Sequence, residues 1–275
     1  MRLDVYLYKY GFSGSRQKSQ DMISGGLIYV NDKQVFKNSY EIDTANDVVK
    51  IKSGITPYVS RGGLKLEAAL KKFKIDVTDM IAADIGASTG GFTDCLLRNG
   101  IRKVYAVDCG RGQLHESLRA NDKVICIENC NARYIDADII NESCDIAVMD
   151  LSFISQALVY PALINILKPE GVLISLIKPQ FETKPENIGK NGIVKNTALH
   201  IEVINKIIIN ALKYDLFCRG IIKSPIKGGE GNTEYLALFI FRVKNPDTKP
   251  IDDIDYRRIK GIVYNDEEYI GNFQQ

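Results

Sequence analysis

The sequence contains no tryptophan, two histidines and six cysteines, and no two of the cysteines form a CxxC pair. Structural zinc sites use cysteine and histidine at short spacings, and disulfide frameworks are typical of small secreted domains. The 275-residue chain, with cysteines scattered from Cys95 to Cys218, matches neither pattern. We therefore expect no bound metal and no disulfide framework.

Long apolar runs are also absent. No stretch approaches the ~18 apolar residues that a membrane span needs. The first residues, MRLDVYLYKY, alternate charged and apolar positions and lack the h-region of a signal peptide. A pore-forming protein would need a membrane-active segment, and none is visible. These absences predict a soluble, cytoplasmic protein without a membrane partner, and we expect a monomer or a weak homodimer.

The net charge of +2 hides an uneven distribution. Residues 1–75 carry 13 Lys and Arg residues against 7 Asp and Glu residues, a net of +6, which leaves −4 for the remainder. A modest basic excess of this kind fits either a solvated surface or an anionic partner such as nucleic acid.

The N-terminal part of the chain predicts two short helices followed by a small sheet. Apolar positions at Leu3, Val5 and Leu7 indicate the first helix, and Ser15 precedes a second, RQKSQDMIS. LIYVNDKQVFK reads as two strands around an Asn-Asp turn, and DVVKIK supplies a third strand. This α+β arrangement over residues 1–52 resembles the S-four RNA-binding module. The resemblance makes the basic residues candidate RNA contacts: Arg2, Arg16, Lys18, Lys33 and Lys37.

From residue 61 onward strands and helices alternate, which predicts a doubly wound parallel sheet. We expect a linker at residues 53–60, a second domain of α/β type at residues 61–244, and a C-terminal extension at residues 245–275, to which no chemistry can be assigned. The strands expected are 80–86, 102–110, 123–129, 144–150 and 171–178, and the helices are 90–99, 155–167 and 197–214. Two last strands, 216–226 and 234–243, are joined by KGGEGNT and should pair antiparallel at one edge. This Rossmann-like sheet with an antiparallel last strand is the methyltransferase form of the fold.

A glycine-rich turn, DIGASTGGF at residues 84–92, follows the first strand. Its glycines do not make GxGxxG, so the dinucleotide fingerprint is absent. Asp108 ends the second strand, where a carboxylate can accept both hydroxyls of an adenosyl ribose. By fold analogy these features favour S-adenosylmethionine over NAD. The expected cofactor contacts are Asp84, Gly86, Ala87, Ser88, Thr89, Gly90, Asp108, Asn131, Ala132 and Asp150.

Ionisable residues converge at the carboxyl edge of the predicted sheet, where open parallel sheets bind ligands. Asp150 and Lys178 end adjoining strands, and Glu234 begins the antiparallel strand, so its side chain comes to the same edge. Lys65, on the helix before the first strand, joins them if that helix crosses the cleft.

Five motifs resemble the TlyA-type methyltransferases, often labelled hemolysins, which join an S-four module to an FtsJ-like ribose 2'-O-methyltransferase domain. They are VSRGGLKLEAAL, DIGASTGGFTDCLL, VMDLSF, LIKPQFE and GGEGNTEYL, and the resemblance spans about residues 1–243. Where some relatives have a tryptophan in the linker at residues 53–60, this chain has none, and Tyr58 is the nearest substitute.

The resemblance implies S-adenosylmethionine-dependent 2'-O-methylation of ribosomal RNA, with ribosomal RNA or ribosomal subunits as the partner. The family's K-D-K-E tetrad falls on Lys65, Asp150, Lys178 and Glu234. Since a sulfonium methyl is already electrophilic, the enzyme must mainly align the ribose hydroxyl and remove its proton. We assign Lys178 as the base, Asp150 and Glu234 as orienting carboxylates, and Lys65 as the group that holds the nucleotide and tunes the field.

Two other functions remain open from sequence. In DLSF the chain has no proline at the two central positions of the D/N-P-P-aromatic motif of base N-methyltransferases, which weakens that alternative. A non-catalytic RNA-binding or ribosome assembly factor would use the basic module and leave the cleft idle, and the intact tetrad argues against it.

Overall fold

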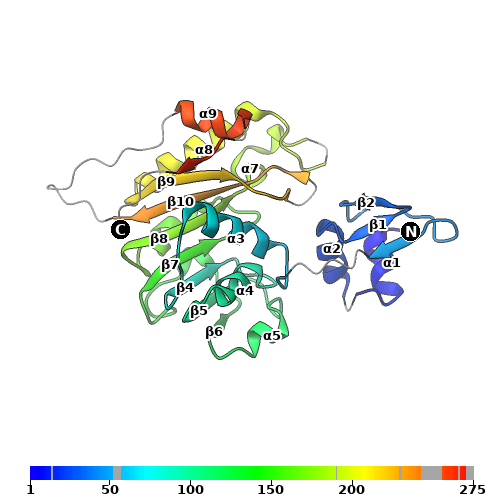
Figure 1. Ribbon diagram of the computed structural model, residues 1–275, viewed down its shortest axis with the longest axis horizontal. Coiled ribbons are helices and arrows are strands. Elements are labelled where there is room, and N and C mark those ends of the chain that lie inside the picture. The colour runs from blue at the N-terminus through cyan, green and yellow to red at the C-terminus, as the bar shows by residue number, and fades with distance from the viewer. Residues whose placement is uncertain are drawn as a thin grey trace.

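The structure is a computed structural model that describes residues 1–13, 15–51, 57–189, 191–228, 231–242, 256–265 and 267–270. It contains a small N-terminal domain and a larger α/β domain, each with its own hydrophobic core (Figure 1). Within the described part of the chain, no helix combines the length and the apolar character needed to cross a membrane.

The N-terminal domain has the predicted order of two helices and three strands. These are α1 Leu3–Lys9, α2 Arg16–Ser24, β1 Ile28–Val30, β2 Lys33–Val35 and β3 Val49–Ile51. β1 lies between β2 and β3 and pairs antiparallel with both. Asn31 and Asp32, with φ of 50° and 62°, form the tight turn between β1 and β2, since a two-residue hairpin turn favours left-handed backbone at both positions.

The larger domain is built on an eight-stranded sheet with the order β11-β9-β10-β8-β7-β4-β5-β6. Its strands are β4 Ile81–Ile85, β5 Lys103–Val107, β6 Val124–Ile127, β7 Cys144–Met149, β8 Leu167–Ile177, β9 Leu216–Lys223, β10 Tyr235–Phe241 and β11 Tyr269–Ile270. Strands β4 to β8 pair in parallel, and β10 pairs antiparallel with β8 and β9. The predicted parallel sheet with an antiparallel last strand is confirmed.

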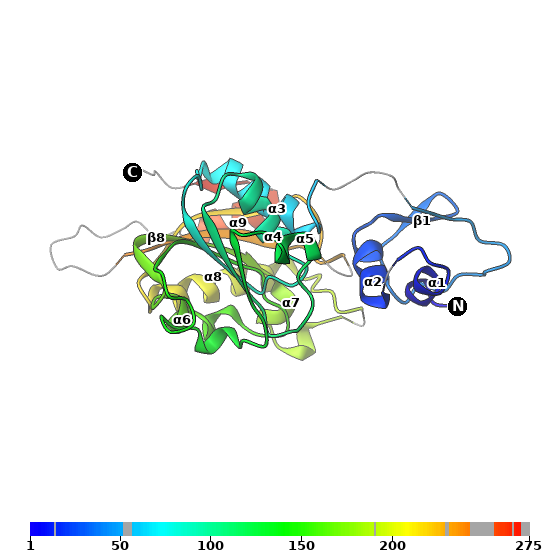
Figure 2. The same cartoon turned by 90° about the horizontal axis from the view of Figure 1, so that it is seen from below.

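Helices cover both faces of this sheet, which explains the nearly continuous apolar strands. α3 Gly62–Phe73 and α4 Gly91–Arg98 pack on one face, and α6 Tyr160–Leu163, α8 Thr197–Leu212 and α9 Tyr256–Asn265 pack on the other (Figures 1 and 2). Short helical turns complete the connections: α5 Glu116–Arg119, η1 Ala132–Tyr134, η2 Gln156–Leu158, α7 Pro179–Glu182 and η3 Pro185–Asn187.

Two segments differ from the sequence expectation. The helix expected over 155–167 is broken into η2 and α6, and β8 already begins at Leu167. Pro161 has no N–H and fits only the first turn of a helix, so it starts the short α6 rather than continuing η2. The C-terminal extension also contributes to the fold, because β11 pairs with β9 and becomes the outermost strand.

Candidate active site

Lys178 and Asp150 form an ion pair where β8 and β7 end. The Lys178 Nζ lies 2.6 Å from the Asp150 Oδ1 and donates a hydrogen bond of 2.9 Å to the Ser152 hydroxyl. Open parallel sheets bind ligands at this carboxyl edge, so the ion pair lies where a ligand is expected.

A second ion pair joins Lys65 to Glu234. The Lys65 Nζ donates to the Glu234 Oε2 at 2.5 Å, and the two side chains are only 9% and 2% exposed. α3 therefore reaches the sheet edge, as the prediction for Lys65 required. Tyr235 pairs with Ile177 across β10 and β8, which sets Glu234 and Lys178 at the same edge.

The two ion pairs interact electrostatically. Burial raises the pKa of Asp150, but the positive charges of Lys178 and Lys65 outweigh it, and the net pKa is lower than usual. Burial lowers the pKa of Lys178, but the negative charges of Asp150 and Glu234 outweigh it and raise the net value. Lys178 is therefore an ammonium group at neutral pH in the protein alone.

Gly228, shortly before β10, leaves room for the Glu234 carboxylate. A Cβ on Gly228 would lie 1.9 Å from the Glu234 Oε1, so only glycine leaves the carboxylate in place. Asn232, which is 3% exposed, accepts from the Val194 N–H at 3.1 Å and donates to the Gly192 carbonyl at 2.8 Å. The sequence motif GGEGNTEYL thus contains positioning residues that motif matching alone did not identify.

The glycine-rich loop comes close to the end of β7. A Cβ on Gly86, at φ +83°, would lie 2.5 Å from the Asp150 carbonyl oxygen, and one on Gly90, at φ +95°, would clash with Leu118. Ala87 is buried, Thr89 is half-buried and Ser88 is exposed with φ of 48°. The loop therefore has the close backbone packing that lets a ligand approach main-chain groups.

The carboxylate of Asp108 is fixed by main-chain donors. Its Oδ2 accepts from the Ser88 N–H at 2.8 Å and its Oδ1 from the Gly110 N–H at 2.7 Å. Each carboxylate oxygen has a further lone pair, so the fixed Asp108 side chain can accept two hydroxyl groups of a ribose.

Asp84 is fully buried below this loop. Its Oδ2 accepts a hydrogen bond from the Thr93 hydroxyl at 2.6 Å, whereas its Oδ1 has no hydrogen-bond partner among the described residues. Burial, as the largest effect, raises the pKa of the Asp84 carboxyl to about 7 although the Thr93 hydrogen bond opposes this. An orphaned buried oxygen at this place is what a polar ligand in the loop would satisfy.

Asn131 and Ala132 lie beside Asp108. The Cys130 N–H donates to the Asp108 carbonyl at 3.0 Å, and the Asn131 Oδ1 accepts from the Arg133 N–H at 3.1 Å. Because the Asn131 oxygen caps η1, its amide nitrogen is the group that can address an adenine edge.

The end of the linker, at Tyr58 and Val59, packs against α4, the helix that follows the glycine-rich loop. Tyr58 is 7% exposed and the Arg98 guanidinium carbon lies 5.6 Å from its ring centroid. The Val59 N–H donates to the Asp94 Oδ2 at 2.8 Å. Tyr58, the expected substitute for tryptophan, is thus a buried anchor for this end of the linker.

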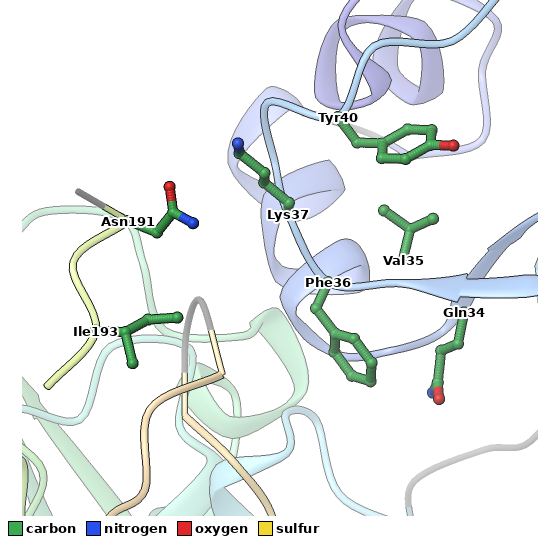
Figure 3. Close-up of a pocket in the computed structure, with 7 residues that line it drawn as sticks. All are labelled: Gln34, Val35, Phe36, Lys37, Tyr40, Asn191 and Ile193. Carbon is green, nitrogen blue, oxygen red and sulfur yellow. The ribbon is translucent and has the colours of Figure 1, made fainter. Parts of the chain in front are cut away.

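The predicted RNA contacts fall into two groups. Arg2 and Arg16 meet at the Asp4 carboxylate, whereas Lys33 and Lys37 are exposed on and after β2. The side chain of Lys18 lies outside the described part of the structure. Lys37 lines a pocket of about 260 Å³ with other N-terminal residues and with Asn191 and Ile193 of the larger domain (Figure 3). None of its lining residues belongs to the tetrad.

Sequence analysis did not single out Ser152 or Phe153. Phe153 is 90% exposed at φ +64°, and its ring centroid lies 4.9 Å from that of Phe181. The Lys178 Nζ in turn lies 5.7 Å from the Phe181 ring centroid. An aromatic residue in DLSF was a visible signal, but its exposure depends on the fold of the loop.

The chain matches two protein-family models. The FtsJ-like methyltransferase model matches residues 58–241 and the S4 domain model matches residues 1–49. The family that the motifs predicted is therefore confirmed. Membership of a methyltransferase family implies S-adenosylmethionine as the methyl donor.

Relatives and solved structures agree with the family models. Hemolysin A of Brachyspira hyodysenteriae is 40% identical over 241 residues, 87% of this chain and 100% of the relative. The 16S/23S rRNA (cytidine-2'-O)-methyltransferase TlyA of Mycobacterium tuberculosis is 35% identical over 234 residues, 85% of this chain and 87% of the relative. The structure named "Putative hemolysin from Streptococcus thermophilus" has a TM-score of 0.75 at 41% identity and covers 96% of this chain and 94% of its own. The chain belongs to the FtsJ-like methyltransferase family and carries an S4 domain at its N-terminus.

Proposed function

We propose that this methyltransferase transfers a methyl group from S-adenosylmethionine to the 2'-oxygen of a ribose in ribosomal RNA. The observation that carries the proposal is the meeting of two lysine-carboxylate pairs, Lys178 with Asp150 and Lys65 with Glu234, at the carboxyl edge of the sheet. The relative from Mycobacterium tuberculosis, whose name states this reaction, supports the choice of a ribose and of ribosomal RNA. Ribosomal RNA as substrate also makes the cytoplasm the expected compartment.

The residues around the glycine-rich loop fit the cofactor. Gly86 leaves no room for a side chain, Asp108 presents a fixed carboxylate, and Asp84 has an orphaned buried oxygen. In the proposal, Asp108 binds the ribose hydroxyls, and Asn131 and Ala132 face the adenine. The main chain at residues 86–90 binds the amino-acid end together with Asp84, and Asp150 stands next to it. S-adenosylmethionine supplies an electrophilic methyl group on a positively charged sulfur.

Lys178 accepts the proton of the ribose hydroxyl in this proposal. It must first be neutral, and its raised pKa shows that the carboxylates of Asp150 and Glu234 oppose this in the protein alone. A positive charge brought next to Lys178 lowers that pKa. After transfer, the same two carboxylates stabilise the ammonium group that forms. Their role is therefore to hold Lys178 in place and to stabilise the protonated state after the reaction.

Lys65 has a different role because Glu234 holds it and its side chain is buried. Lysine is a compact positive charge that binds phosphate oxygens well. We assign to it the orientation of the target nucleotide, while the Glu234 carboxylate fixes its position. The exposed Phe153 ring, next to Phe181, is suited to stack on the base of an unpaired target nucleotide.

The two domains divide the work in this proposal. Residues 1–52 bind RNA phosphates through Arg2, Arg16, Lys18, Lys33 and Lys37, and residues 61–244 carry the chemistry. Residues 53–60 connect them, and residues 245–275 extend the catalytic domain.

Analysis of the methylated product tests this function. The full chain is incubated with methyl-labelled S-adenosylmethionine and with ribosomal subunits from a strain that lacks this enzyme, and the RNA is digested to nucleosides. We expect the label in a 2'-O-methylated nucleoside. Label in a base would support an N-methyltransferase instead, and binding of subunits without methylation would support a non-catalytic assembly factor.

A further inference from the structure

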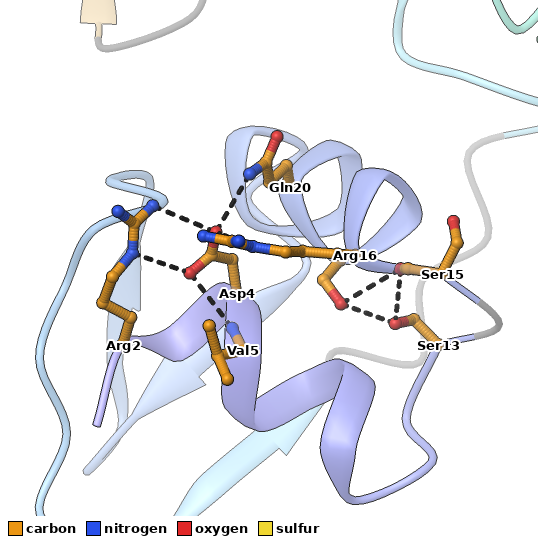
Figure 4. A network of polar contacts seen from close by, with 8 residues as sticks. Arg2, Asp4, Val5, Ser13, Ser15, Arg16 and Gln20 are labelled. Atoms are coloured by element: carbon orange, nitrogen blue, oxygen red, sulfur yellow. Dashed lines mark hydrogen bonds and ion pairs between the residues drawn. The ribbon is translucent and has the colours of Figure 1, made fainter.

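A buried carboxylate at Asp4 gathers two arginines in the N-terminal domain. The Asp4 side chain has no solvent exposure. Its Oδ1 accepts from the Arg2 Nε at 3.0 Å, and its Oδ2 accepts from the Arg2 Nη2 and the Arg16 Nε, both at 3.0 Å. Gln20 and the Val5 N–H complete the shell at 2.9 and 3.0 Å. Figure 4 shows the two guanidinium groups approaching this one carboxylate from different directions.

The carboxylate is ionised at all physiological pH values. Burial alone would raise the pKa of Asp4, but the hydrogen bonds from Gln20, Arg2 and Arg16 outweigh it and bring the value to about 2. One negative charge is thus shared by two positive charges, and the cluster of Arg2, Asp4 and Arg16 keeps a net charge of +1.

The arginines are held but remain accessible. The Arg2 and Arg16 side chains are 45% and 52% exposed, whereas Asp4 is not exposed at all. Asp4 uses the Nε of both residues and one further nitrogen of Arg2, and a guanidinium has five N–H donors. The unused donors are suited to phosphate oxygens, which arginine binds with a planar fork.

We propose that Asp4 is a positioning residue that holds Arg2 and Arg16 in place for binding to RNA phosphate groups. This inference rests on the proposed RNA binding by the N-terminal domain. Side chains already ordered before binding lose less conformational entropy when the RNA arrives. Asp4, although negatively charged, thereby increases the affinity for RNA. Its direct electrostatic repulsion of the RNA phosphates would decrease that affinity.

The sign of the effect gives a sharp test with Asp4→Asn in the full chain. Removing a negative charge should strengthen RNA binding if charge alone matters. The positioning role predicts the reverse, a dissociation constant for purified ribosomal subunits that rises by about tenfold, the scale of a lost charge-assisted hydrogen bond. Glu41→Gln is the matched control, because Glu41 is exposed and lies opposite Arg2 in a backbone bridge but is outside the Asp4 shell. Its affinity should stay equal or increase.

Arg16→Lys keeps the test decisive if Asp4→Asn unfolds the domain, which hydrogen exchange of residues 1–51 would report. Lysine keeps the charge but has no Nε–H fork for Asp4. The affinity should fall several-fold while the salt dependence, which follows the number of phosphate charges neutralised, stays the same.

A third arm addresses whether Asp4 acts through the arginines. In a protein with Arg2→Ala and Arg16→Ala, Asp4→Asn should cause no further loss of affinity. Wild-type affinity in folded Asp4→Asn or in Arg16→Lys would overturn the inference. Failure of the proposed function would look different, because the wild-type protein itself would then neither bind nor methylate the subunits.

Discussion

Lys65 donates a 2.5 Å hydrogen bond to Glu234 although the two residues stand 169 positions apart in the chain. The contact joins α3, the helix before the first strand of the larger sheet, to the residue immediately before the antiparallel strand β10. Because β10 runs antiparallel to β8, the start of β10 and the preceding Glu234 lie at the edge where β7 and β8 end. The antiparallel strand is therefore what brings the fourth ionisable group to the site.

Gly228→Ala should impair catalysis by displacing Glu234. The new Cβ would lie 1.9 Å from the Glu234 Oε1, so the carboxylate must move away from Lys65. We expect a fall in the methylation rate of about tenfold or more, the scale of one misplaced charged group, together with a lower melting temperature because a buried ion pair is disrupted. Gly62→Ala is the control, since its Cβ would meet other atoms only at 3.4 Å or beyond. An active Gly228→Ala variant would remove Glu234 from the positioning role.

The pH dependence of methyl transfer should reflect the ionisation of Lys178. A base that must be neutral gives a single-turnover rate that rises with pH until its pKa is passed. Asp150 is the foremost charge raising this pKa, so Asp150→Asn should shift the rising limb to lower pH and also reduce the maximal rate. Asp145→Asn, at the opposite end of β7 and paired with Lys168, should leave the limb in place. An unshifted limb in Asp150→Asn would argue against Lys178 as the titrating group.

Asp84 should make the cofactor-free protein less stable as pH rises. Its folded-state pKa of about 7 is above the ordinary 3.8, so the folded protein holds a proton that the unfolded chain releases. The free energy of unfolding therefore falls between about pH 4 and pH 7, by at most about 4 kcal/mol for a shift of this size. Denaturant titrations at several pH values should show this decline in the wild type and a weaker one in Asp84→Asn. Parallel curves for the two proteins would show that Asp84 ionises normally.

Phe153→Ala should weaken RNA binding without changing affinity for S-adenosylmethionine. The ring is 90% exposed beside Phe181, where it can stack on a base. Loss of one base stacking interaction costs about 1–3 kcal/mol, so KM for ribosomal subunits should rise by about 5- to 150-fold. Phe153→Tyr should keep most of the affinity, and Leu158→Ala, at a residue 53% exposed in the same connection, should have little effect. Equal KM values for Phe153→Ala and wild type would exclude stacking.

Sequence reasoning predicted the features that follow from topology. The alternation of strands and helices predicted that Asp150, Lys178 and Glu234 lie at one edge of the sheet. The K-D-K-E motif added Lys65 to this group, although the sequence did not show whether its helix reaches that edge. The turn at Asn31 and Asp32 was equally predictable, because few residues tolerate left-handed backbone.

Features that depend on contacts between distant segments were not predictable. The sequence around Gly228 does not indicate that the Glu234 side chain will pack against it. Asp4 is likewise an ordinary acidic residue in a basic domain until the positions of Arg2 and Arg16 are known. The pairing of β11 with β9 likewise needs the tertiary fold. The direction of the Lys178 pKa shift is a balance of burial against two carboxylates, and only the three-dimensional arrangement decides it.

Single-turnover methylation of ribosomal subunits by wild type, Lys178→Ala and Lys178→Arg tests the account most directly, with melting temperatures and cofactor affinities measured alongside. Lys178→Ala should fold and bind S-adenosylmethionine nearly as the wild type does, while its rate falls by about 10²–10⁴-fold, the usual effect of losing a general base. Lys178→Arg should be almost as slow, because a guanidinium keeps the positive charge next to Asp150 but does not give up its proton. Wild-type activity in Lys178→Arg would contradict the assignment and reduce Lys178 to a structural partner of Asp150.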